Sequence, residues 1–419
     1  MANVFTKTET VMFDEIVAGY EDALEVSDHV SKYGVNGELN ERSNDTIWRL
    51  VPYILTSKTR VIGTDVTPND VKQLAVPSSL AFKKVVPWKL SATEMRDTEQ
   101  EGRLQVAASQ RLASDINTAI RDVVSLEGTL VVATSGAAGD CDDIAEIESL
   151  MDELGVSQID RKLGLGTRDW NGMAGNLASR TLMPKSVGAF EQSRIGMIAN
   201  LETFKIAKGL ALGANGATVT IDTTGAQVRY VPLSSESTTN GEINVDNRTQ
   251  TITVDGTTGV TAGDCYTIAG ITAIHHINKE STGQPKTFRV ISVDDGTTLT
   301  VSPPMVGANS SPTAPEEAYK NIEVDSTSAT AAITFLNTTA TSLNPFWHRD
   351  SIELLIGRYQ VPTDQGPAVL KSTTKQGLEV VMTKEFKAGT YESDFFLDVF
   401  FGTVNKNPEM NGVQFFGQS

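Results

Sequence analysis

The sequence is poor in the residues that build metal sites and disulfide frameworks. It contains two cysteines and four histidines in 419 residues. Cys141 and Cys265 lie far apart and form no Cys-x-x-Cys or Cys-x-x-His spacing, which argues against a disulfide scaffold and a zinc site. His275 and His276 are neighbours in an expected strand, where their side chains point to opposite faces and cannot chelate one ion together. We predict no metal, and we interpret both cysteines as small buried residues.

Motifs that carry catalysis are also missing. We find no Gly-x-Ser-x-Gly, His-Glu-x-x-His, phosphate-binding loop or EF-hand. The segment Gly164–Asp169 opens like a dinucleotide fingerprint, but Asp169 stands where the third glycine belongs, so we interpret it as a loop. The adjacent acids Asp142–Asp143 and Asp294–Asp295 fit a helix start and a hairpin turn. Because no nucleophile is matched with a base, we predict a protein that is not an enzyme and takes no cofactor.

Long apolar runs are absent. The run Phe395–Phe401 is far shorter than the ~18 residues of a membrane span, and Asp398 interrupts it. The first residues include Lys7, Glu9 and Asp14 and show no apolar leader core. We therefore expect no membrane segment, no secretory leader, and synthesis in a cytoplasm.

Positive charge is scarce. Lysine and arginine number 35 against 52 acids, a net charge of −17. This excess repels phosphate backbones, so tight nucleic-acid binding is excluded as the main function. The length exceeds the roughly 100 to 150 residues of a typical domain and predicts more than one packed unit.

The first half of the chain predicts an arm, a loop and a long helix. Apolar residues at helical spacing predict a helix over Val11–Tyr33 whose outer face is acidic. This helix is either simply solvated or an arm that docks a basic partner. Residues 53–87 carry prolines and no helical stripe, which predicts a long hairpin that needs a neighbouring surface, such as a second subunit. Ala92–Glu127 predicts a helix on the order of 50 Å long, with two shorter helices broken at Gly102 as the alternative.

The second half predicts a β-rich insertion. Residues 216–343 hold 26 threonines in 128 positions, in short alternating runs separated by Asp-Gly turns. This pattern is typical of antiparallel strands that close into a small barrel or sandwich. Its flanks, Gly209–Gly216 and Asn337–Asn344, are expected to lie side by side. Around it we predict a strand at 129–134, helices at 141–154 and 185–205, and strands at 352–356, 378–382 and 395–401.

Short motifs spread over the chain carry a family resemblance. They are Ser43–Trp48, Met95–Asp97, Gly128–Val132, Asn244–Arg248, Thr257–Val260, Gly263–Asp264, Asn344–Trp347 with Asp350, Asn407–Pro408 and Gln414–Gly417. With them the sequence resembles the major capsid proteins of tailed bacteriophages, in the short-tailed Salmonella-phage branch that carries an inserted β-barrel. The resemblance implies an α+β fold, the capsid fold shared by tailed phages and herpesviruses and known as the Johnson fold, with a long spine helix and an extended β-hairpin loop.

The resemblance also implies a division of the chain and a function. The parts would be an arm (1–44), peripheral strands with an extended loop (45–90, loop about 52–77), a spine helix (91–128), an axial domain (129–215), the inserted barrel (216–343) and a return segment (344–419). Many copies would form pentamers and hexamers of an icosahedral head around double-stranded DNA, directed by a scaffolding protein and joined by a portal protein. The protein would reside in the virion after assembly in the host cytoplasm, with DNA as a weak, non-specific neighbour.

Contact residues follow from the same resemblance. Asp14 and Glu15 match an arm that meets the basic scaffold. The extended loop over a neighbouring subunit offers Lys58, Arg60, Asp65 and Lys72. The insertion's loop near 234–248 offers Glu242, Asp246 and Arg248 for contacts between capsomers, although Glu242 replaces a basic residue seen in relatives.

Two other classes fit parts of the composition. A surface or extracellular β-rich adhesion protein shares the threonine-rich strands but needs a leader sequence. A hydrolase with an accessory β domain needs a clustered histidine or carboxylate pair, which the sequence does not show.

Overall fold

The computed structural model describes residues 7–24, 26–34, 46–52, 54–55, 57–66, 68, 71–94, 98–139, 141–179, 195–222, 230–239, 241–307, 318–323, 330–359 and 368–418. They divide into two compact units. The first unit comprises residues 1–47, 78–122 and 352–404, and the second comprises 48–77, 123–351 and 405–419. Motif residues 43–45 and 95–97, and residues 185–194 of the helix predicted at 185–205, lie outside the described residues.

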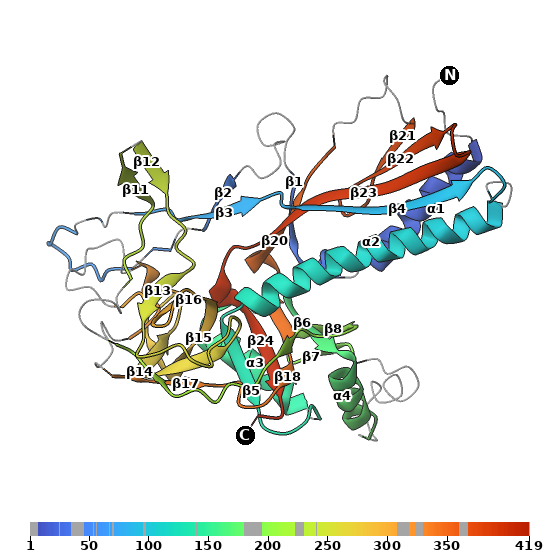
Figure 1. Ribbon diagram of the computed structural model, residues 1–419. Coiled ribbons are helices and arrows are strands. Elements are labelled where there is room, and N and C mark those ends of the chain that lie inside the picture. The colour runs from blue at the N-terminus through green and yellow to red at the C-terminus, as the bar shows by residue number, and fades with distance from the viewer. Residues whose placement is uncertain are drawn as a thin grey trace. The chain divides into compact units, whose positions relative to one another are not determined.

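The first unit is a sheet of six strands with two helices. Its strands run in the order β1-β20-β23-β22-β21, and β4 pairs with β23 along ten residues. The strands are β1 (Ser31–Gly34), β4 (Phe82–Ser91), β20 (Ile352–Ile356), β21 (Ala368–Thr373), β22 (Glu379–Lys387) and β23 (Glu392–Asn405). The helices are α1 (Lys7–Ala23) and α2 (Thr98–Glu127), of which residues 123–127 belong to the second unit, and Figure 1 shows α2 as the longest helix. The strands predicted at 352–356, 378–382 and 395–401 are thus confirmed.

Helix α1 packs on one face of this sheet through a buried ion pair. The Glu9 carboxylate, 6% exposed, binds the Lys384 ammonium, 13% exposed. Lys384 also lies over the Phe395 ring, which stacks on Trp88 of β4. Because side chains alternate along a strand, this pair marks the covered face of the sheet. The attraction between the two opposite charges offsets the desolvation cost of burying them.

The predicted helix over Val11–Tyr33 is wrong in its second half. Helix α1 ends at Ala23, a short 3-10 turn η1 (Val26–His29) follows, and Ser31–Gly34 form strand β1. β1 pairs in parallel with β20, more than 300 residues away in the sequence. The distant partner decides the conformation, because a strand in a sheet gains backbone hydrogen bonds that a local helical pattern does not anticipate.

Helix α2 is a single helix. It runs through Gly102 without a break, so the alternative of two shorter helices is wrong. At 1.5 Å per residue its 30 residues span about 45 Å. Ser91 and Glu94 form a capping box, in which the Glu94 carboxylate accepts from the Ser91 amide at 2.9 Å, but the described helix starts at Thr98, later than the predicted Ala92. It ends before Gly128, where a Cβ would meet the Val124 carbonyl oxygen at 2.7 Å.

The second unit is centred on a mixed sheet in the order β5-β24-β19-β6-β8-β7. Its strands are β5 (Leu130–Thr134), β6 (Arg161–Gly166), β7 (Met197–Ile198), β8 (Leu201–Ile206), β19 (Asn344–His348) and β24 (Asn411–Phe416). Helices α3 (Cys141–Glu153) and α4 (Thr167–Ser179) cover it, and their buried residues join one core with β6. A short 3-10 turn, η4 (Arg349–Ser351), follows β19, and another, η5 (Pro408–Met410), precedes β24. The strand predicted at 129–134 and the helix at 141–154 are confirmed.

Two other predictions in this unit are wrong. Gly164–Asp169 is not a loop, because it contains the end of β6 and the first turn of α4. The described part of the helix predicted at 185–205 consists of strands β7 and β8, and β8 pairs in parallel with β6. In both cases a strand of the central sheet overrides the local pattern.

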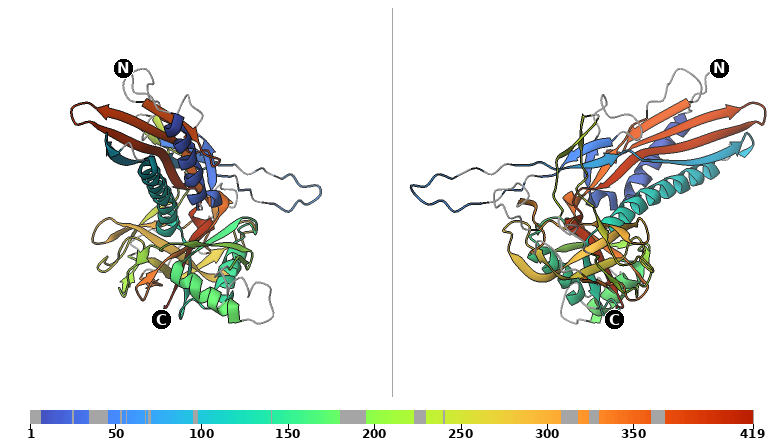
Figure 2. Two further views of the ribbon diagram at one scale, coloured as in Figure 1. Left: turned by 90° about the vertical axis from the view of Figure 1, so that its right-hand side faces the viewer. Right: turned by 60° about the vertical axis from the view of Figure 1, so that its left-hand side comes forward.

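The extended loop leaves the second unit from the short strands β2 (Thr46–Leu50) and β3 (Ala75–Ser79), which pair with each other. Figure 2 shows the segment between them as a narrow excursion in both views. Among the described residues of this segment, strand pairing is confined to its base, so the predicted long hairpin is confirmed only there. Large apolar side chains are exposed along it, including Leu55, Val61 and Ile62 at 68%, 63% and 101%.

The inserted domain is a small barrel. Its strands β10 (Val219–Thr220), β13 (Gln250–Thr253), β14 (Cys265–Ile274), β15 (Ser281–Val293), β16 (Thr298–Ser302) and β17 (Ala332–Phe335) pair in the order β10-β17-β14-β15-β16-β13. A bridge between Ile221 and Val254 joins the two edges and closes the sheet. The inward side chains, among them Tyr266, Phe288 and Val301, form a separate core. Together with the two mixed sheets, this barrel gives the α+β fold predicted from the sequence.

The flanks of the insertion lie side by side, as predicted. Strand β9 (Ala211–Leu212) pairs with β18 (Thr341–Ser342), and the Asn215 amide donates to the Asn337 carbonyl oxygen at 2.8 Å. The buried carboxylate of Asp264 accepts from the side-chain amides of both asparagines, at 2.6 and 2.9 Å, and from the Thr261 amide at 2.7 Å. One carboxylate therefore ties the entry of the domain to its exit.

We predict that residues 209–344 fold alone and that Asp264→Ala weakens this fragment. The loss of the shared acceptor leaves the buried Asn215 side-chain amide without its partner and takes one of two acceptors from that of Asn337, so it should lower the free energy of unfolding by about 3 kcal/mol. Circular dichroism and urea unfolding of the fragment measure both effects. Asp222→Ala, at an exposed aspartate, is the matched control and should change little. A fragment without cooperative unfolding, or equal losses in both variants, would contradict the prediction.

Candidate functional site

The predicted contact residues of the arm and the loop lie on exposed surface. Asp14 and Glu15 are exposed on α1, whereas Glu9 of the same helix is buried. In the extended loop, Lys58, Arg60 and Asp65 are exposed, and Lys72 is half-buried near the base. The Lys72 carbonyl oxygen accepts from the Tyr319 hydroxyl at 2.6 Å, which ties the base of the loop to the inserted domain.

The third predicted set belongs to a hairpin of the insertion. Strands β11 (Ser235–Thr238) and β12 (Gly241–Asn244) pair only with each other and are exposed nearly throughout. Glu242 lies on this exposed hairpin, where its carboxylate accepts from the Ser235 hydroxyl at 3.3 Å. Asp246 and Arg248 follow at the hairpin's base and are only partly exposed. The three predicted residues are therefore divided between tip and base.

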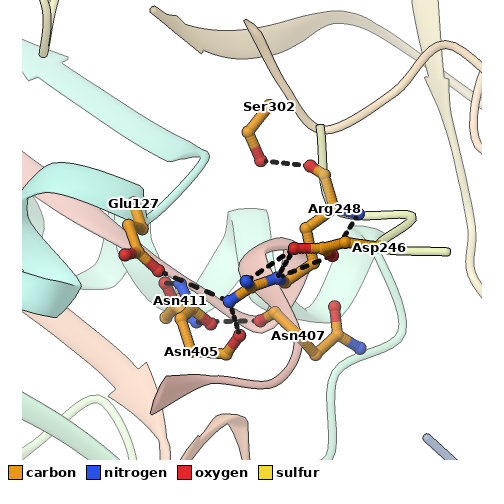
Figure 3. Close-up of polar contacts among 7 residues, drawn as sticks. All are labelled: Glu127, Asp246, Arg248, Ser302, Asn405, Asn407 and Asn411. Atoms are coloured by element: carbon orange, nitrogen blue, oxygen red, sulfur yellow. Dashed lines mark hydrogen bonds and ion pairs between the residues drawn. The ribbon is translucent and has the colours of Figure 1, made fainter. Parts of the chain in front are cut away.

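Arg248 is held within its own chain (Figure 3). Its guanidinium forms a two-pronged contact with Asp246, at 3.0 Å from Nε and 2.7 Å from Nη2. Nη1 donates to the Asn405 carbonyl oxygen at 2.9 Å and lies 3.8 Å from the Glu127 carboxylate at the end of α2. A planar guanidinium suits such a fork because it presents several donors in fixed directions.

The electrostatics of this cluster favour the paired state. Burial alone would lower the pKa of Arg248, but the hydrogen bond and charge of Asp246, with Glu127, raise it above its usual range. Burial raises the pKa of Glu127, and the Arg248 charge partly offsets that rise. Removing Arg248 would therefore leave carboxylates without compensation in a poorly solvated place. The contact of Asp246 and Arg248 with a second subunit stays a prediction.

Strand β15 brings two further cations to the same junction. The Lys286 ammonium, 4% exposed, binds the Glu409 carboxylate of η5. The fully buried Arg289 donates to the Ser125 carbonyl oxygen in the last turn of α2, where a helix favours positive charge. Between them, the Thr287 hydroxyl donates to the Thr129 carbonyl oxygen at 2.8 Å. One strand of the inserted domain thus contacts both the helix end and the C-terminal segment.

The positive charges of the insertion are concentrated here. Residues 216–343 contain 13 acids and only six bases, and three of those bases are Arg248, Lys286 and Arg289. We call these three residues and their partners Ser125, Glu127, Asp246, Asn405 and Glu409 the junction cluster. Sequence reasoning missed Lys286, Arg289 and Glu409. One indication of these contacts is visible in the sequence: Lys286 and Arg289 lie three residues apart in a strand-like run of an otherwise acidic domain.

His276 lies beside the junction cluster. Its backbone amide donates to the Leu154 carbonyl oxygen at 2.9 Å, and its side chain borders a cavity of about 90 Å³ that Glu409 and Asn321 also line. Burial lowers the pKa of His276, Glu409 acts against this, and Lys279 and Lys286 add to it. Burial alone would raise the pKa of Glu409, but Lys286, with His276 and Lys279, brings it below its usual range.

Within the described ranges, no group of three or more histidine, cysteine or acidic side chains is placed to hold a metal ion. His275 and His276 lie directly after β14, His276 in a turn, so their predicted place in a strand is wrong; the His275 ring packs against Gly155. None of the helices in the described part of the chain has the length and apolar character needed to cross a bilayer.

Comparison with known families decides between the three function classes. The sequence model of the family described as P22 coat protein, gene protein 5, matches residues 1–417. The chain belongs to the P22 coat protein family. It is therefore a phage major capsid protein, a structural subunit of an icosahedral capsid and part of the virion, and it is not an enzyme. This confirms the family resemblance and excludes the hydrolase.

Solved structures similar to this coat protein include phage capsids. A structure from Mycobacterium phage Che8 is 9% identical over 89% of this chain and 85% of that chain, with a TM-score of 0.41. The capsid of cyanophage P-SCSP1u is 9% identical over 93% and 87%, with a TM-score of 0.43. The CUS-3 coat protein I-domain is 34% identical over 30% of this chain and 99% of that chain, with a TM-score of 0.22.

We predict that acid loosens the junction cluster of the coat protein in two steps. An unfolded histidine titrates near pH 6.5 and an unfolded glutamate near 4.3. Since the folded pKa of His276 is lower than its unfolded value, the unfolded chain gains protons first, and the free energy of unfolding falls as the pH drops below about 6.5. The stability that Glu409 supplies is present above about pH 4.3 and is lost below it for the same reason.

His276→Gln separates the two steps. Urea unfolding of the monomer between pH 7.5 and about 3 should show a smaller loss of stability at about pH 6.5 to 5 in this variant than in the parent chain. The later loss, due to Glu409, should remain. His29→Gln, in the first unit, is the matched control and should leave the first step in place. Identical pH profiles for His276→Gln and the parent chain would contradict the prediction.

Proposed function

We propose that this coat protein assembles as pentamers and hexamers into a closed head around double-stranded DNA, under the direction of a scaffolding protein. The observation that carries the proposal is the extended loop. It exposes Leu55, Val61 and Ile62 on a segment paired only at its base, where two strands bury too little surface to be stable by themselves. Such a loop is stabilised when it lies over a second copy of the chain.

The arm supports a role for a basic scaffold. Asp14 and Glu15 are exposed neighbours on α1, while Glu9 anchors the same helix to the sheet through Lys384. A partner can therefore bind the outer acids without unfolding the arm. Charge attraction of this kind raises the association rate and selects the partner, and its strength falls with salt.

The β11–β12 hairpin supports contacts between capsomers. Its exposed strands present Glu242, while Arg248 and Asp246 fix its base to the rest of the unit. A rigid base beneath an exposed tip reduces the conformational entropy lost on contact. In this proposal the tip makes the contact, and the pair at the base orients it.

The net charge of −17 supports a shell that encloses DNA without gripping it. A polyanion next to an acidic lining gains no counterion-release affinity, so DNA is a weak, non-specific neighbour. The remaining partners of the proposal are the portal protein and further copies of this chain, and assembly takes place in the host cytoplasm. Contacts worth a few kcal/mol each add up over a closed shell, whereas stronger ones would trap wrong sizes.

Electron microscopy of the purified chain, alone and with its scaffolding protein, tests the proposal. Closed shells of uniform size with the scaffold, and few or irregular shells without it, are expected. A chain that remains monomeric or forms filaments under both conditions would contradict it.

We predict that Asp14→Lys with Glu15→Lys reduces the yield of scaffold-directed shells about tenfold, equivalent to ~1.4 kcal/mol of docking. The monomer should keep its melting temperature, because both positions are exposed. Shell yield by sedimentation and melting of the monomer are the two measurements. Glu148→Lys with Glu153→Lys, on α3, makes the same charge change as a control. A normal yield from the arm variant would refute docking at these acids.

We predict that Glu242→Lys and Asp246→Ala both weaken contacts between capsomers, for different reasons. Glu242→Lys changes the exposed tip, so shells should dissociate at lower urea while the monomer is unchanged. Asp246→Ala removes the carboxylate that binds the Arg248 guanidinium. It should also lower the monomer's free energy of unfolding by about 3 kcal/mol. Urea dissociation of shells and unfolding of monomers separate the two effects. Shells of normal size and stability from both variants would count against the hairpin contact.

A further inference from the structure

A cavity of about 90 Å³ lies at the base of the extended loop, and all of its lining residues belong to the second unit. Val51, Ile54 and Leu74 contribute apolar walls from the loop, and Pro303 and Val306 contribute them from the insertion. We call it the loop-base cavity. Since an apolar cavity of roughly 150 Å³ can hold benzene, this one has room for a smaller group of about four carbons.

Polar side chains gather at one end of the loop-base cavity. A second cavity, of about 20 Å³, shares His276, Asn407 and Glu409 with the first. Because the same three side chains line both spaces, they mark the place where the two cavities adjoin. The loop-base cavity therefore combines apolar walls with one polar end, which is the usual character of a small-molecule site.

Two of these polar side chains have hydrogen-bond donors that are not used. Asn407 Oδ1 accepts from the Glu409 amide at 3.1 Å and caps η5, but its Nδ2 makes no hydrogen bond within the described residues. The His276 ring makes none either in that part of the chain. Burial lowers the pKa of His276, so the ring is neutral at pH 7 and offers one N–H donor. Two donors at the end of an apolar cavity suit a ligand that carries an acceptor.

The charges around the two cavities favour an anion. Their lining carries four cations and one carboxylate, namely Arg248, Lys286, Lys320, Lys406 and Glu409. Lys286 binds Glu409, which compensates the charge of that carboxylate. Even with Asp246 and Glu127, which lie against Arg248, the cations outnumber the acids. This is a local reversal in a chain with a net charge of −17, and it attracts a carboxylate and repels an ammonium of the same size.

We propose that the loop-base cavity binds a small branched aliphatic carboxylate. The ligand's carboxylate accepts from the Asn407 side-chain amide and from the His276 N–H, and its carbons fill the space between Val51 and Val306. The ligand contacts the base of the extended loop and the insertion together, so its binding stabilises the attachment of one to the other. The site does not depend on assembly, and the unassembled chain is sufficient to test it.

Three ligands with one carbon skeleton test the chemistry of the site. Isovalerate, isoamyl alcohol and isoamylamine are titrated into the full-length monomer at constant ionic strength, and binding is measured by calorimetry. Isovalerate should bind with a Kd of about 1 mM, a weak affinity because the ligand is small. The alcohol lacks the charge and the amine reverses it, so both should bind about tenfold more weakly or not at all. Equal binding of the three ligands, or no binding of isovalerate at about 50 mM, would overturn the proposal.

Asn407→Asp tests the polar end of the cavity. Aspartate keeps the acceptor that caps η5 but replaces the Nδ2 donor with a negative oxygen, so isovalerate should bind at least about tenfold more weakly. Asn278→Asp makes the same charge change at an exposed asparagine outside both cavities and should leave the affinity unchanged. Equal affinities of the parent and Asn407→Asp, or equal losses in both variants, would contradict a carboxylate bound at Asn407.

Ala75→Leu tests the apolar end, because it places a larger side chain at a buried position that lines the loop-base cavity. A folded Ala75→Leu chain should lose isovalerate binding, and its melting temperature without ligand shows whether it is folded. If it is not, hydrogen exchange of the parent chain locates the ligand instead. The amides of Val51, Leu74 and Val306 should exchange about threefold more slowly with isovalerate present. Unchanged exchange at these amides, or full binding by a folded Ala75→Leu chain, would overturn the proposal.

Discussion

Buried positive charge must find a partner, and in this coat protein that requirement holds the inserted domain in place. Lys286 and Arg289 both lie on strand β15 of the barrel. Lys286 binds Glu409, and Arg289 donates to the Ser125 carbonyl oxygen at the end of α2. Neither cation could remain buried without these partners, since the desolvation of a charge costs several kcal/mol. The barrel is acidic as a whole, yet its few bases are concentrated where it meets the rest of its unit. We therefore expect folding of the domain, driven by the barrel core, to be separable from its docking, driven by charge.

This arrangement divides the charges of the coat protein into two groups with different tasks. Those of the junction cluster are buried or half-buried, bound within the chain and less screened by salt than exposed charges. Those of the arm, the extended loop and the β11–β12 hairpin are exposed and available to other molecules. The same distinction occurs on one strand of the first unit, where Asp394 is bound internally and Asp398 has no hydrogen bond or ion pair with the residues that the structure describes. A subunit that must hold its own shape while making many weak contacts needs both groups.

The sequence predicted what depends on local pattern. Alternating threonine-rich runs revealed the barrel, since side chains in strands repeat every two residues, and the spacing of Leu112, Ile116 and Ile120 revealed α2. Ser31–Gly34 was misread because its conformation depends on β20, far away in the chain. The Lys286–Glu409 pair joins residues 123 positions apart, and no periodicity predicts such a pair. Asp398 was visible only as an interruption of an apolar run, because its lack of a partner is a property of the folded sheet.

The central claim is that the junction cluster works within one chain while the loop, the hairpin and the arm work between chains. A cryo-electron microscopy map of the assembled shell, at a resolution that shows side chains, tests it most directly. The account predicts that Lys286 contacts Glu409, and Arg248 contacts Asn405, of the same chain in every subunit, and that Arg60 lies against a neighbouring chain. A map in which Arg248 or Lys286 binds a neighbouring subunit, or in which the extended loop folds back on its own chain, would contradict it.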